Sequence, residues 1–70
     1  MKISQAFEAV FEIDCRLLIK REVKRGVRIT IVHNPTNQSR SLLVDREALE
    51  RLPVLIDQLT DAMVKHLAEN

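Results

Sequence analysis

The sequence predicts an α+β protein in which a four-stranded antiparallel sheet is followed by a long C-terminal helix, in the order ββββα. Three observations predict this class: apolar residues alternate with a period of two in the first half, polar turns interrupt the middle, and a helical period follows Asp45. The 70 residues, 46% hydrophobic and 30% charged, have the composition of an ordered protein, and we expect one small domain over residues 1–70.

The first apolar run alternates from Phe7 to Ile19, which predicts strand structure. A straight strand of that length would extend about 43 Å, whereas a chain of this size has a radius of gyration of about 11 Å. We therefore expect a bend at Asp14–Cys15. A second interpretation stays open, in which residues 4–12 form a helix capped by Ser4 and the order is αβββα.

A β-hairpin is predicted where the segments Cys15–Val23 and Val27–His33 flank the turn Lys24–Gly26. A three-residue loop keeps the apolar positions of both strands on one face of the sheet. Gly26, the one glycine of the chain, would then occupy a position with positive φ. The same arrangement places Glu22 opposite Arg28 on the other face, where the two charges attract each other.

A further strand is predicted after the polar loop Pro35–Gln38, at the segment RSLLVD. In the register that this loop favours, Ile31 pairs with Leu42, so the apolar face continues into this strand.

The C-terminal helix is predicted to begin at Asp45, a good N-cap, and apolar residues then recur every three or four positions. Pro53 predicts a kink, or a short first helix that ends near Leu52. The apolar stripe is wider than one sheet face requires, which predicts a homodimer. The expected dimer interface consists of Val54, Leu55, Leu59, Met63 and Leu67.

Positive charge is concentrated in the middle of the chain. The net charge is only +1, yet residues 16–46 contain eight lysines or arginines and two acidic residues. This pattern indicates either a solvated surface or a site for an anionic partner. The candidate nucleic-acid-binding residues are Arg16, Lys20, Arg21, Lys24, Arg25, Arg28 and Arg40.

Catalytic and metal-binding patterns are absent from the sequence. His33 and His66 are far apart, Cys15 has no second cysteine, and no glycine-rich phosphate loop occurs. We therefore expect neither an enzyme, nor a metal site, nor a cofactor. The N-terminal segment contains no long uncharged apolar run, so we expect no signal peptide or membrane span and a cytoplasmic location.

The segment RLLIKREVKRGVRITIV followed by RSLLVDREALERLPVLIDQL resembles the single-stranded-nucleic-acid-binding modules of the positive-cofactor-four coactivator type. The purine-rich-element-binding repeats and the whirly proteins share that plan. The resemblance implies a curved four-stranded sheet, a helix that forms a dimer, basic strands that follow a nucleic-acid backbone, and a role in transcription regulation.

The sequence thus predicts binding of single-stranded DNA or RNA through phosphate contacts, with little sequence preference. Base stacking would have to come from arginine planes or from the two phenylalanines, since the chain has no tryptophan or tyrosine. An alternative from another class is a small adaptor or inhibitor, phage-type or regulatory, whose basic hairpin docks on an acidic protein partner. Both functions require exposed positive charge on the hairpin, so the charge pattern does not distinguish them.

Overall fold

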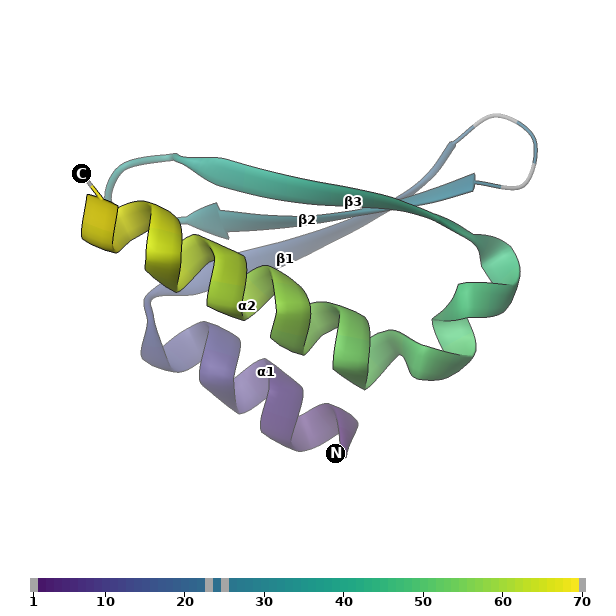
Figure 1. Ribbon diagram of the computed structural model, residues 1–70, viewed down its shortest axis with the longest axis horizontal. Helices are drawn as coiled ribbons and strands as arrows, with labels where there is room; N and C mark the ends of the chain where they lie inside the picture. Colours follow the sequence, from purple (N-terminus) through teal and green to yellow (C-terminus); the bar gives the residue numbers. More distant parts are fainter. Residues whose placement is uncertain (1, 23, 25, 70) are drawn as a thin grey trace.

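The computed structural model describes residues 2–22, 24 and 26–69, which form an α+β fold of the order αβββα. In this part of the chain the sheet has three antiparallel strands in the order β1-β2-β3. Both α-helices lie on the same face of the sheet, and the opposite face is open (Figure 1). The elements are α1 (Ile3–Glu12), β1 (Cys15–Arg21), β2 (Gly26–His33), β3 (Ser39–Asp45), the 3-10 helix η1 (Arg46–Arg51) and α2 (Leu52–Glu69).

The first segment is a helix, so the preferred prediction of a fourth strand is wrong and the alternative order αβββα is confirmed. Ala6 and Val10, four residues apart, are 1% and 0% exposed, whereas Phe11, which a strand would have turned inward, is 67% exposed. A helix satisfies its own backbone hydrogen bonds and buries this face against α2. The expected bend is present, because Asp14 separates α1 from β1 with a φ of 57°.

The first hairpin differs from its prediction by two residues in register. The backbone N–H of Glu22 donates to the carbonyl oxygen of Gly26 at 2.9 Å, so the turn lies between these two residues. The positive φ of this turn belongs to Lys24, at 73°, and not to Gly26. Gly26 instead leaves room for a neighbouring strand, since a Cβ there would lie 3.2 Å from Leu43 Cδ1.

The second hairpin is also shifted by two residues, because Leu42 pairs with Ile29 and not with Ile31. Asn37, with a φ of 63°, provides the left-handed residue of this turn. A shift by two leaves every side chain on its predicted face, since strand side chains alternate with a period of two. It does move Arg40 opposite Ile31, on the face that the helices cover.

The hydrophobic core forms between the central strand and the two helices. Ile29 and Ile31 of β2 are fully buried, as are Ile56 and Met63 of α2 and Val10 of α1. A central strand is protected by neighbours on both edges, so its two isoleucines become the least accessible apolar groups of the sheet.

The interruption predicted around Pro53 is present. The chain after Asp45 first forms η1, and α2 then begins at Leu52. Pro53 lies in the first turn of α2, where its missing N–H has no intrahelical acceptor in any case.

Helix α1 occupies much of the apolar surface that led us to expect a dimer. Leu55, Leu59 and Met63 are buried inside the single chain, and Leu67 packs partly against the same core. Val54 is the exception, with 49% exposure. The apolar stripe of α2 is wider than contact with the sheet alone requires, because α2 also packs against α1.

The helical assignment of residues 3–12 predicts unequal losses of stability for two neighbouring substitutions. Val10→Ala should lower the free energy of unfolding by about 2 kcal/mol, because it removes buried apolar volume. Phe11→Ala should cost only about 0.5 kcal/mol, mainly through its stacking on Phe7 one turn away. Urea denaturation followed by circular dichroism measures both values. A larger loss of stability for Phe11→Ala than for Val10→Ala would contradict the helix and favour the strand interpretation.

Candidate functional site

The uncovered face of the sheet combines cations, hydroxyl groups and exposed leucines. Because side chains alternate, residues of even number in β1 and β2 share this face with residues of odd number in β3. One row across the sheet consists of Lys20, Arg28 and Leu43, and the rows beside it contribute the other side chains. Those others are Arg16, Leu18, Glu22, Thr30, Val32, Ser39 and Ser41.

Two leucines make this face unusually apolar for a solvated surface. Leu18 is 51% exposed and Leu43 is 60% exposed, although both lie on strands. On the same face the hydroxyl oxygens of Thr30 in β2 and Ser41 in β3 are 2.8 Å apart and share a hydrogen bond. The open face thus presents two separate exposed leucines among polar and charged side chains.

Arg28 is held by an acid on the same face. Its Nε donates to Glu22 Oε1 at 2.7 Å, and the two side chains are 43% and 31% exposed. This hydrogen bond, more than the nearby positive charges, lowers the pKa of Glu22 from its ordinary value. The expected attraction of the two residues is confirmed, although they lie diagonally and not directly opposite. Arg28 therefore supports the hairpin and offers less free charge to a ligand than its neighbours do.

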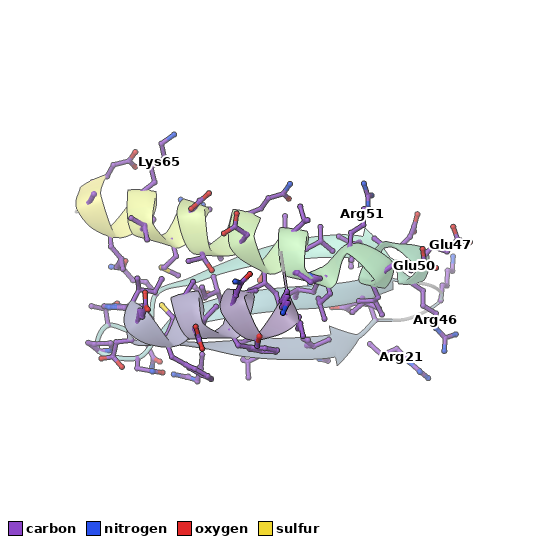
Figure 2. The ribbon with its side chains drawn as sticks, turned by 90° about the horizontal axis from the view of Figure 1, so that it is seen from below. Arg21, Arg46, Glu47, Glu50, Arg51 and Lys65 are labelled. Atoms are coloured by element: carbon purple, nitrogen blue, oxygen red, sulfur yellow. The ribbon has the colours of Figure 1, made fainter. Side chains whose placement is uncertain are left out.

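Three other cations converge at the hairpin end of the molecule. Arg21 of β1, Lys24 of the turn and Arg46 of η1 line one hollow with a volume of about 390 Å³. Figure 2 shows Arg21 and Arg46 at the same end of the structure. Among the described residues, none of the three forms an ion pair or a side-chain hydrogen bond. The remaining lining residues are Ile19, Gly26, Val27 and Leu49, and none of them is acidic.

Arg46 was absent from the residues predicted to form the site. Its preceding neighbour, Asp45, pairs with Gly26 at the base of the first hairpin, and this pairing brings η1 beside the turn. The pairing depends on the register of the second hairpin, which the sequence placed two residues away.

The seven expected cations do not form one group. Lys20, Arg21, Lys24 and Arg28 lie toward the first hairpin, whereas Arg16 and Arg40 lie toward the other end of the sheet. Arg25 lies outside the described residues.

Both distant arginines have partners within the chain. The guanidinium of Arg16 donates to Asn34 Oδ1, and Arg40 Nη2 donates to His66 Nδ1 at 3.2 Å on the helix-covered side. These contacts connect the loop before β3 and the end of α2 to the sheet.

Acidic residues are mixed with the cations of η1. Glu47, Glu50 and Arg51 line a separate shallow hollow with Asp45 and Ala48. Figure 2 shows Arg51 directed away from Arg21 and Arg46. Of the two hollows beside η1, the one toward the first hairpin thus has no acidic residue among its described lining residues, whereas the other has three.

The histidines and the cysteine do not assemble into a reactive site. His33 Nδ1 is hydrogen-bonded to Thr36 Oγ1 at 2.8 Å, and His66 is at the far end of α2. Burial, with a smaller effect of the charge of Asp14, raises the pKa of the Cys15 thiol, so the unreactive protonated form is favoured. Within residues 2–22, 24 and 26–69, no three potential metal ligands come together, and no helix has the length and apolar character to cross a membrane.

The two aromatic residues are also remote from the hairpin cations. Phe7 and Phe11 stack on each other in α1 with ring centroids 6.4 Å apart. The end of α1 that contains Phe11 lies toward the opposite end of the sheet from the first hairpin (Figure 1).

No protein-family model matches the chain, and searches of curated proteins and of solved structures find no match either.

The ion pair on the open face predicts a specific pH dependence. The pKa of Glu22 is lowered in the folded state, so its stabilising effect is complete above its ordinary pKa and is lost as the pH falls through the lowered value. Acidification from about pH 7 to about pH 2 should therefore reduce the thermal midpoint more in the parent than in Glu22→Gln. Thermal unfolding by circular dichroism measures both, and identical pH profiles would mean that the pair does not stabilise the fold.

Proposed function

We propose that this protein binds nucleic acid, preferentially single-stranded, with little sequence preference, through the first hairpin and the open face of the sheet. The observation that supports this proposal best is a group of exposed cations at the hairpin end of the sheet, none of which forms an ion pair with another described residue. They are Lys20 on the open face, Arg21 on the other face of the same edge strand, and Lys24 in the turn. A nucleic-acid backbone is a regular array of negative charges, and cations without internal partners can neutralise it without losing a native ion pair.

The apolar groups of the open face favour a single strand over a duplex. Unpaired bases expose flat apolar surfaces, and Leu18 and Leu43 provide exposed side chains on which such bases can pack. The bases of a duplex are stacked within the helix, so a duplex would leave both leucines largely uncovered. Thr30 and Ser41 lie in the same row across the sheet as Leu18 and can exchange hydrogen bonds with base edges or with sugars.

Low sequence preference follows from the kinds of contact available. Phosphate contacts position a strand and carry no sequence information. Both phenylalanines belong to α1, which does not reach the first hairpin (Figure 1). Aromatic stacking therefore contributes little beside the hairpin cations, and affinity depends mostly on charge.

A protein-binding adaptor is the second candidate, and one observation favours it. Glu47 and Glu50 lie among Arg46 and Arg51 on η1, and a surface of mixed sign suits a protein partner better than a uniformly negative one. The nucleic-acid proposal has more support because no acidic residue is among the described residues that line the hollow of Arg21, Lys24 and Arg46.

Salt dependence tests the proposal. Three phosphate contacts, from Lys20, Arg21 and Lys24, should give a slope of log affinity against log salt of about −2 for a single-stranded oligonucleotide of about 20 nucleotides. Lys20→Gln and Lys24→Gln should each weaken binding and reduce the magnitude of the slope by about 0.7. Fluorescence anisotropy with a labelled oligonucleotide, titrated at several salt concentrations, measures these values.

Lys65→Gln is the matched control. Lys65 is also an exposed lysine, it lies near the end of α2, and Figure 2 shows it at the opposite end of the molecule from Arg21. The control removes the same charge and should leave both affinity and slope unchanged. Absence of binding at low salt would favour the adaptor, and an equal loss in Lys65→Gln would show that binding depends only on net charge.

A further inference from the structure

We propose that the hollow between the first hairpin and η1 binds a terminal phosphate, the phosphate monoester group of a nucleotide. Its two possible sources are a free nucleoside 5′-monophosphate and the 5′-phosphorylated end of a single strand. The inference deepens the proposed function. Binding of a strand end rests on that function, whereas binding of a free nucleotide does not.

The hollow is separate from the open sheet face. Ile19, Arg21 and Val27 have odd numbers, so they belong to the face of β1 and β2 on which the helices lie. At the hairpin end η1 forms the opposite wall of the hollow through Arg46 and Leu49. A strand that crosses the open face and ends at the hairpin edge would therefore bring its terminus to this hollow.

The charge of the hollow matches a monoester better than other common anions. Three cations from three different elements line it, and they repel one another in the absence of a ligand. A phosphate monoester carries a charge of about −1.5 to −2 near neutral pH and has three terminal acceptor oxygens. A carboxylate or an internal phosphodiester carries a single negative charge, which leaves more of this positive charge uncompensated.

Arginine contributes geometry as well as charge. The planar guanidinium groups of Arg21 and Arg46 can each donate two parallel hydrogen bonds to phosphate oxygens, and Lys24 adds a compact charge from the turn. Neither arginine has to give up a partner among the described residues in order to bind a ligand.

The apolar part of the hollow favours a nucleotide over inorganic phosphate. Ile19 is 50% exposed although it lies on the helix-covered face, because the helices do not cover this corner of β1. With Val27 and Leu49 it forms an apolar wall beside the cations. The volume of about 390 Å³ falls in the range of small-molecule sites, and the wall can contact a sugar or a base attached to the phosphate.

The test compares two oligonucleotides of the same sequence, one with a 5′-phosphate and one with a 5′-hydroxyl, each labelled at the 3′ end. The parent protein should bind the phosphorylated strand about tenfold more tightly, the effect expected from one or two added charge-assisted hydrogen bonds. Arg46→Gln should abolish this preference and leave the affinity for the 5′-hydroxyl strand unchanged.

Arg51→Gln provides a control within the same short helix. It removes the same charge from η1, but Arg51 lines the other hollow and points away from the hairpin, so the preference for the 5′-phosphate should persist. Thermal unfolding of both variants checks that the fold is intact. An equal loss of preference in Arg51→Gln would overturn the assignment of the hollow.

The remaining outcomes separate this inference from the proposed function. Equal affinity of the parent for both strands overturns the terminal-phosphate site and leaves single-strand binding intact. If neither strand binds, the proposed function fails, and a titration with nucleoside 5′-monophosphate followed by NMR decides the inference alone. Chemical-shift changes at Arg21, Lys24 and Arg46 would support the site, and their absence would overturn it.

Competition identifies the source of the phosphate. If nucleoside 5′-monophosphate displaces the phosphorylated strand from the hollow, a free nucleotide is sufficient. If it does not, while the 5′-phosphate preference persists, the site requires the strand end.

Discussion

Burial of one face of the central strand is the constraint on which the rest of this structure depends. Ile29 and Ile31 of β2 are fully buried beneath α2, which contributes Ile56 and Met63 to the same core. The helices cover that face and no other, so the second face of the sheet remains open with its leucines and cations. The described cations at the hairpin end of the sheet, Lys20, Arg21 and Lys24, are also exposed.

The pairing of β3 with β2 brings the cations of the candidate site together. Because Asp45 lies opposite Gly26, the chain leaves the sheet next to the first hairpin, and η1 places Arg46 beside Arg21. The same pairing places Arg40 on the helix side, where it contacts His66 at the other end of the sheet. Strand register, more than the number of basic residues, thus determines which cations can act together.

Sequence patterns predicted the sheet faces but not the register, and for the first segment they favoured a strand while a helix stayed open as the alternative. A period of two determines the face of each strand residue, and a shift by two residues leaves that face unchanged. Register depends on which turn residue adopts a positive φ, and Lys24 is a residue type that rarely does so. Residues 7–12 fit both periods, and the burial of Ala6 and Val10 against α2, a tertiary contact, favours the helix. Arg46 was missed because its position follows from that register.

The most direct test of this account is a two-dimensional ¹⁵N–¹H NMR titration with a 5′-phosphorylated single-stranded oligonucleotide. The account predicts that chemical-shift changes concentrate on β1, the described part of the first hairpin and Arg46, with smaller changes on β3 near Leu43. The outer face of α2 around Val64 and the exposed side of α1 around Phe11 should remain unperturbed. Changes centred on Phe11 or Val64, with none at Lys24 or Arg46, would contradict it.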